Sequence, residues 1–164
     1  MSVHRVVVAD TTPLNYFILI DQIEVLRELF GEVMIPEAVL VELRHPKAPP
    51  AVANWLLNLP PWLTVAKVAH LDPSIQLGRG ENEAISLAVE RQIPIVLMDE
   101  RRGRSAAEAR GLLAVGTLNL LDLADERGLL EGVTVLETLK QTTFRADAEL
   151  LDRFEARMRA RNTT

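Results

Sequence analysis

The stretch His4-Arg5-Val6-Val7-Val8-Ala9-Asp10 decides the fold that the sequence predicts. Three consecutive valines are typical of a strand that is buried on both faces of a sheet, and the acid at position 10 ends the apolar run. We therefore expect a buried strand over His4–Ala9, with a carboxylate directly at its carboxyl end.

Outward from this strand, short apolar segments alternate with amphipathic helices. Because strands separated by helices pair in parallel through right-handed crossovers, the order predicts a doubly wound α/β sandwich of three layers, α/β/α, around a parallel sheet. Further strands are expected at Val33–Ile35, Leu63–Val68, Pro94–Met98 and Leu113–Val115. Helices are expected from Thr12-Pro13, over Ile23–Phe30, from Pro36, near Val52–Leu57, from Gly80, and over Ser105–Arg110, Thr117–Arg127, Thr134–Gln141 and Asp147–Arg161.

Length and composition agree with one ordinary globular domain over residues 1–164, with an amphipathic helix in its last part, 145–164. The chain has no cysteine, which excludes disulfides, thiolate nucleophiles and cysteine-ligated zinc. The apolar run Val6–Ala9 is too short for a signal peptide or a membrane helix, so we expect a cytoplasmic protein without a membrane partner. A net charge of −5 argues against a passive nucleic-acid binder but not against a nuclease with a metal site.

Two acids end predicted strands, Asp10 and Asp99. In open parallel sheets the binding site lies at the carboxyl ends of the strands, so both acids are candidates for that site. The alternative for Asp10 is a helix N-cap, a position that aspartate often occupies. Two acids in equivalent positions favour function over capping.

Two further acids lie on predicted helices. Glu42 follows apolar positions on the helix that begins at Pro36, and its alternative is a solvated helix charge. Glu81 lies in a first helical turn, where the helix dipole alone favours a carboxylate. Glu83 and Glu100 compete with these two for the same roles. A site built from carboxylates, with isolated histidines, favours a hard cation such as Mg²⁺ or Mn²⁺.

At this point the sequence resembles the PIN domain family. The motifs that carry the resemblance run in the family's order over about residues 4–130, and they are Val6–Leu14, Ile35–Leu43, Gly80–Ala88, Ile95–Arg101 and Val115-Gly116-Thr117. Within the family the chain resembles the VapC-like toxin ribonucleases of type II toxin–antitoxin systems, in a subgroup like DUF3368.

The resemblance implies a sheet in the order 3-2-1-4-5, and a pocket in which Asp10, Glu42, Glu81 and Asp99 are both metal ligands and catalytic residues. It also implies cleavage of RNA by metal-activated water, with Mg²⁺ or Mn²⁺ as cofactor and a cognate antitoxin as partner. By the same resemblance, Thr12 makes a hydrogen bond within the site. One departure is Glu81, because the wider family usually has Asp there, and the longer side chain puts the catalytic rate in doubt.

Several arginines follow Asp99. We expect Arg101 and Arg104 to bind substrate phosphates, with Arg104 preferred because similar proteins carry an arginine there. The alternative is a solvated helix face paired with nearby glutamates. The last helix, with arginines at 153, 157 and 161, is predicted to dock on the core rather than to bind RNA. The apolar stretch Trp55–Leu63 is predicted to pack in the core or, where exposed, to contact an antitoxin or a second copy in a homodimer.

Two other functions stay open at this stage. A non-enzymatic PIN-like module that binds RNA or a protein partner would leave the acids without a catalytic role. A phosphoryl-accepting receiver domain also places acids at strand ends, but it would need paired acids after the first strand and a lysine at the end of a late strand. No lysine lies between Lys67 and Lys140, which disfavours the receiver.

Overall fold

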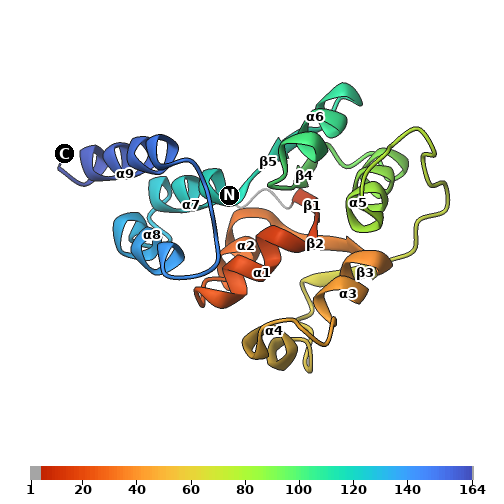
Figure 1. Ribbon diagram of the computed structural model, residues 1–164, viewed down its shortest axis with the longest axis horizontal. Helices are drawn as coiled ribbons and strands as arrows, with labels where there is room; N and C mark the ends of the chain where they lie inside the picture. The colour runs from red at the N-terminus through yellow and green to blue at the C-terminus, as the bar shows by residue number, and fades with distance from the viewer. Residues whose placement is uncertain (1–4, 164) are drawn as a thin grey trace.

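The computed structural model describes residues 5–163 and contains a five-stranded parallel sheet. The strand order is β3-β2-β1-β4-β5, which confirms the expected order and the α/β/α class (Figure 1). The first predicted strand is confirmed from Arg5 onward, and His4 lies outside the described residues. The strands are β1 Arg5–Ala9, β2 Gly31–Pro36, β3 Leu63–Ala66, β4 Ile95–Leu97 and β5 Leu113–Val115.

Helices connect all the strands and continue after the last one. They are α1 Thr11–Leu19, α2 Glu24–Phe30, α3 Glu37–Leu43, α4 Pro50–Trp55, α5 Arg79–Glu90, α6 Arg101–Ala109, α7 Thr117–Glu126, α8 Gly132–Lys140 and α9 Ala148–Asn162. None of the helices in residues 5–163 is long and apolar enough to cross a membrane.

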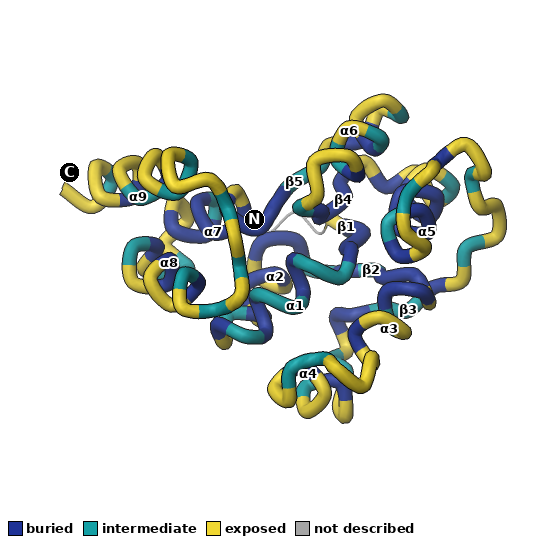
Figure 2. Tube along the Cα trace, viewed as in Figure 1, coloured by how far each residue is buried: buried dark blue, intermediate teal, exposed yellow. Residues whose placement is uncertain are grey.

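The alternation of side chains along β1 divides the core into two layers. Val7 and Ala9 point into a cluster with α1, α2, α4 and α7, whereas Val8 points into a cluster with α5 and α6. All three residues are fully buried, as the dark strands of Figure 2 show. Because both faces of the sheet are covered, a continuous apolar run in β1 is what this position requires.

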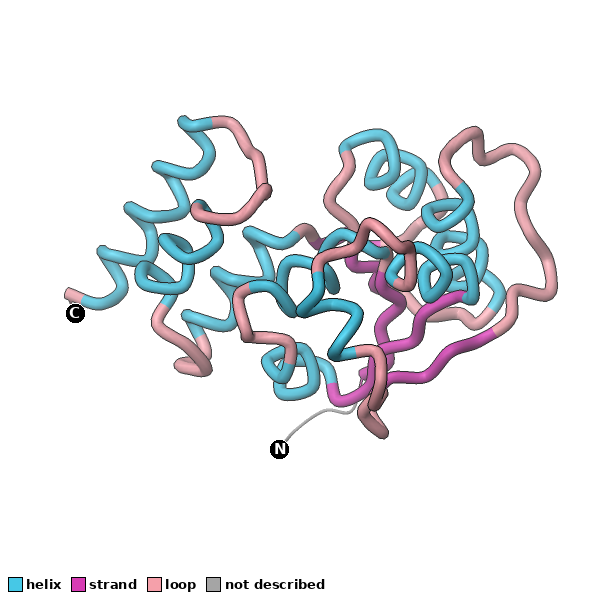
Figure 3. Tube along the Cα trace, turned by 60° about the horizontal axis from the view of Figure 1, so that its bottom comes forward, coloured by secondary structure: helices cyan, strands magenta, loops and turns pink. Residues whose placement is uncertain are grey.

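A third cluster lies beyond the sheet, where α7, α8 and α9 pack on one another. Figure 3 shows these helices extending to one end of the molecule, away from the strands. Phe154 and Met158 bury the apolar side of α9, as expected for a docking helix. Asp125 joins all three helices, because it accepts a hydrogen bond of 2.8 Å from Gly132 N and pairs with Arg161 at 2.5 Å.

Several boundaries differ from those predicted, and two of the differences have a clear physical reason. Helix α6 begins at Arg101 rather than Ser105, because its buried side is made of the small residues Gly103 and Ala107, and the arginines around Gly103 hide this periodicity. Strand β3 ends at Ala66 rather than Val68, because its partner β2 ends at Pro36, which pairs with Ala66.

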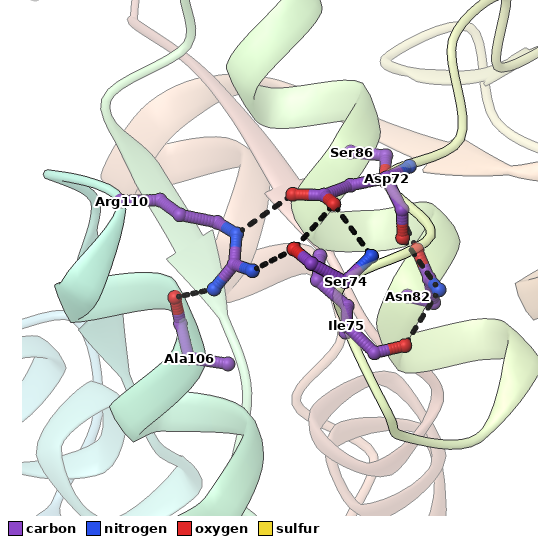
Figure 4. A network of polar contacts seen from close by, with 7 residues as sticks. All are labelled: Asp72, Ser74, Ile75, Asn82, Ser86, Ala106 and Arg110. Carbon is purple, nitrogen blue, oxygen red and sulfur yellow. Dashed lines mark hydrogen bonds and ion pairs between the residues drawn. The ribbon is translucent and has the colours of Figure 1, made fainter.

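A polar network holds the long loop before α5 in place (Figure 4). Arg110 donates to Asp72 at 3.0 Å and to the Ser74 hydroxyl at 2.9 Å, and Asp72 accepts from both the amide and the hydroxyl of Ser74. From α5, Asn82 donates to two carbonyl oxygens of the loop. The hydrogen bonds from the Ser74 hydroxyl and amide, and then that from Arg110, hold the pKa of Asp72 down to about 2. The loop therefore fixes the point at which α5 starts.

Replacing Arg110 with alanine should loosen this loop. We expect Arg110→Ala to increase deuterium uptake over residues 69–78 and to leave uptake in α8 and α9 unchanged, because the bonds lost are local. Arg91→Ala is the matched control, because it removes an exposed arginine at the C-terminal end of α5 that takes no part in the network. Equal uptake in the parent and in Arg110→Ala would show that the network does not order the loop.

Candidate functional site

Asp10 follows β1 directly and is only 5% exposed. It occupies the N-cap position of α1, but its side chain makes no capping hydrogen bond, so capping does not account for it. Burial raises the pKa of Asp10 to about 6; the Thr11 amide opposes this rise, and the charges of Glu42 and Asp99 add to it. A buried carboxylate with so little compensation is costly unless a cation or a proton neutralises it.

Asp99 follows β4, the strand next to β1, and is held by the start of α7. Its two oxygens accept hydrogen bonds from the Thr117 amide at 2.6 Å and from the Thr117 hydroxyl at 2.5 Å. Burial raises the pKa of Asp99, while the Thr117 bonds and the nearby Arg104 charge oppose this rise. A β-carbon at Gly116 would lie 2.9 Å from Asp99 Oδ1, so glycine keeps room for the carboxylate.

Glu42 on α3 reaches the starts of two other helices. Its carboxylate accepts a short hydrogen bond from the Thr11 hydroxyl and one of 3.2 Å from the Gly80 amide. A β-carbon at Gly80 would lie 2.5 Å from Glu42 Oε1, a distance that real contacts do not reach. Glycine at position 80 therefore lets Glu42 approach the first turn of α5.

Glu81, one residue further on, is half-buried, and its Oε2 atom has no hydrogen-bond partner among residues 5–163. Burial, the adjacent Glu100 carboxyl, and the charges of Asp10 and Glu42 raise the pKa of Glu81 to about 7. An orphaned buried oxygen surrounded by other acids is the arrangement expected where a cation is to be bound.

Glu83, a competitor in the sequence, serves the fold instead. It is buried, and its oxygens accept from the Ala38 amide at 3.2 Å and from Arg79 Nε at 2.9 Å. Oε1 thus joins α5 to α3, and Oε2 is used by an ion pair within α5. Glu100, the other competitor, lies beside Glu81.

The expected substrate-binding residues occupy different places. Thr12 is half-buried in α1, and its side chain has no hydrogen bond to any residue that the structure describes, whereas its neighbour Thr11 bonds Glu42. Arg101 is exposed at the start of α6. Arg104 is half-buried beside Asp99, and its Nε atom is buried without a partner in the described part of the chain. No glutamate in residues 5–163 pairs with either arginine.

The charge interactions show that the four predicted acids and Glu100 surround one region at the carboxyl edge of the sheet. Among residues 5–163, however, no three Asp, Glu or His side chains are close enough together to hold a metal ion as they stand. The donor chemistry still fits Mg²⁺, which binds oxygen, keeps several waters and needs only one or two carboxylates. Glu81 has an oxygen without a partner among residues 5–163 for this role, and Asp10, Glu42 and Asp99 have lone pairs to spare.

The sequence did not single out Thr11 for the role that the structure gives it. Thr11 is adjacent to an acid and could have been found only by knowing that α1 and α3 meet. Thr117 was part of a recognised motif, but its bonds to Asp99 span 18 residues and depend on the pairing of β4 with β5.

Comparison with known families supports the resemblance. The model of one family, described as DUF3368: PIN domain, matches residues 6–159, which is nearly the whole chain. Searches of curated proteins and of solved structures found no significant match.

Replacing Asp10 with asparagine should stabilise the metal-free protein near neutral pH. The folded-state pKa values of Asp10 and Glu81 are raised, so the contribution of these two groups to the stability of the metal-free fold is greatest below about pH 4 and is lost as the pH rises to about 7. Asp10→Asn removes one such charge, and a shift of about two pKa units corresponds to at most about 3 kcal/mol. Thermal unfolding in EDTA at pH 8 should show a higher Tm for the variant.

The difference should shrink at pH 5, where Asp10 is protonated in the folded parent. Asp152→Asn, at an exposed position on α9, makes the same chemical change and should alter the Tm little at either pH. A lower Tm for Asp10→Asn at pH 8 would mean that the Asp10 carboxylate stabilises the fold rather than burdening it.

Proposed function

Because the chain belongs to the DUF3368 family of PIN domains, whose fold is of nuclease type, we propose that it is a metal-dependent endoribonuclease. The observation that carries the proposal is Asp10, a buried carboxylate that caps no helix and lies among other acids where the sheet predicts a site. A structural acid would have partners for its oxygens, as Glu83 has.

In the proposed site, Asp10 and Glu81 hold Mg²⁺ or Mn²⁺ with their carboxylate oxygens, and Glu42 and Asp99 complete the acidic pocket. The bound ion would supply Lewis acidity to the scissile phosphate and lower the pKa of water to produce a nucleophile. Thr117 orients Asp99, and Thr11 with the Gly80 amide orients Glu42, so each of these carboxylates is held in a single orientation.

The two arginines at the start of α6 have different parts in the proposed site. Arg104, with a buried Nε that lacks a partner, binds a substrate phosphate beside Asp99, while the exposed Arg101 supports it from the rim. Thr12, whose hydroxyl has no partner among the described residues, is free to donate to the substrate.

We further propose that the protein is the toxin of a type II toxin–antitoxin system and forms a homodimer. The Trp55–Leu63 stretch supports this in part. Most of it packs in the first core cluster, as the sequence predicted, but Leu57 is 76% exposed. Val41 on α3 is 70% exposed as well. Such apolar side chains are the kind that a protein partner covers.

A second candidate function is a non-enzymatic module that binds RNA or a protein. The observation that favours it is the capping of helices by two of the four acids, because Asp99 and Glu42 both accept from amides of a first helical turn. Acids retained only for capping would need no metal.

Cleavage of RNA by the purified protein decides between the two. We expect cleavage with Mn²⁺ or Mg²⁺, none in EDTA, and a loss of at least about a hundredfold in Asp10→Asn, because both the charge and a ligand oxygen are removed. Circular dichroism should show that the variant is folded, and Asp152→Asn should cleave like the parent. Undiminished cleavage by Asp10→Asn would refute the proposed role of Asp10, and the absence of cleavage with any RNA would favour the binding module.

Gly80→Ala tests the placement of Glu42 without touching an acid. The added β-carbon must displace the Glu42 carboxylate from the start of α5. Because alanine is favoured over glycine in a helix by about 1 kcal/mol, the Tm should fall little or rise, while metal-dependent cleavage should drop by about tenfold or more. Glu42→Gln should reproduce the loss of cleavage. Full activity in both variants would exclude Glu42 from the site.

A further inference from the structure

A cavity of about 400 Å³ starts at the site and runs toward the C-terminal helix. One wall begins with Asp99, Arg104 and Gly116 and continues along the first turn of α7. The other wall is formed by α9 and by the segment before it, which includes Phe144 and Arg145. The volume lies in the range of small-ligand sites in proteins. The candidate active site is thus continuous with a pocket that the acids themselves do not form.

The arginines of α9 differ in whether an acid pairs with them, although both Arg153 and Arg157 line the cavity. Arg157 pairs with Asp122 at 3.0 Å, Arg159 lies 3.7 Å from Glu155, and Arg161 pairs with both Asp122 and Asp125. Arg153 lines the cavity, and no acid within residues 5–163 pairs with it. The one arginine of this helix without an acidic partner in the described chain is therefore a cavity residue.

A second cavity arginine, Arg145, also lacks an acidic partner within residues 5–163. Arg145 donates only to the backbone carbonyl oxygens of Thr142 and Phe144, at 3.1 and 2.9 Å, so its charge is not neutralised. Arg104 has a buried Nε without a partner in the described residues. In a chain with a net charge of −5, two cavity arginines without an acidic partner in the described residues, and a third, Arg104, with an unsatisfied Nε beside Asp99, mark a site for an anion with several charged groups.

The rest of the lining suits a nucleotide base. Phe144 is half-buried, packs edge-on against Tyr16 with ring centroids 5.1 Å apart, and lines the cavity together with Leu150. Asn119 adds a side chain that can both donate and accept hydrogen bonds. Aromatic side chains among arginines are the usual means of binding single-stranded nucleic acid, whose bases are free to stack.

On the basis of the proposed ribonuclease function, we propose that this cavity binds a nucleotide of single-stranded RNA next to the scissile phosphate. Arg145 and Arg153 bind the phosphate backbone of the strand, and Arg104 binds the phosphate that lies beside Asp99. Phe144 contacts the base. Helix α9 thereby has two roles, since Phe154 and Met158 dock it on α7 and α8 while Arg153 faces the substrate.

Binding is measured apart from cleavage, by fluorescence anisotropy of a labelled single-stranded RNA in EDTA over a range of KCl concentrations. All proteins carry Asp10→Asn, so that no cleavage occurs. Arg153→Ala and Arg145→Ala should each weaken binding by about tenfold. Each should also lower the slope of log K against log salt by about 0.7, as expected for one lost phosphate contact on a single strand. Phe144→Leu should weaken binding without changing the slope.

Arg159→Ala is the matched control, because it removes the same charge from the same helix at an exposed position outside the cavity. Equal losses of RNA affinity in Arg153→Ala and Arg159→Ala would show that only the net charge of the protein matters, and this would overturn the proposal. It would also be overturned if the parent does not bind RNA at low salt, if a duplex of the same length binds as tightly, or if polyglutamate displaces the RNA at equal charge. Circular dichroism confirms folding of each variant.

The outcomes separate this proposal from the one on which it rests. Selective loss of binding in the cavity variants, together with no cleavage by the protein with native Asp10 in Mn²⁺, would support the cavity and refute the ribonuclease. Metal-dependent cleavage with unchanged binding in the cavity variants would support the ribonuclease and refute the cavity.

Discussion

The backbone hydrogen bond from Asp10 N to Leu97 O, 2.9 Å long, extends the pairing of β1 with β4 to the residue directly after β1. Met98 N bonds Val115 O at 2.9 Å in the same way, one strand further across the sheet. These bonds keep three strands in register up to the edge where they end. Asp10, Asp99 and Thr117 are consequently brought together by the backbone, before any side-chain interaction acts.

Placing several carboxylates together at this edge is electrostatically unfavourable. The surrounding helices offset this repulsion more for some of the acids than for others. The amides at the starts of α7 and α5 and two threonine hydroxyls bind Asp99 and Glu42. Helix N-termini are electropositive, so these bonds offset part of the charge of the two acids. Asp10 and Glu81 have less of this help, and their raised pKa values reflect it. The division identifies Asp10 and Glu81 as the pair whose charges a bound cation would compensate most.

Structure could be predicted from the sequence where a residue and the hydrophobic pattern directly around it determine the element. The valines of β1 and the acids that end β1 and β4 were readable in this way, because parallel sheets bury whole strands and expose their carboxyl ends. The contacts that orient the acids were not readable, because the Thr11–Glu42 and Thr117–Asp99 bonds join elements far apart in the chain. The start of α6 was missed because small buried residues give no apolar signal.

Helix α9 shows why one amphipathic pattern supported two interpretations in the sequence. Docking and RNA binding appeared as alternatives because Arg153, Arg157 and Arg161 follow one another at the spacing of a single helical stripe. In the structure the acids of α7 end partway along that stripe, so Asp122 neutralises Arg157 and Arg161 but leaves Arg153 at the cavity. The distinction depends on the position of α7 relative to α9. A pattern within one helix cannot contain that information, since it is a property of the packed pair.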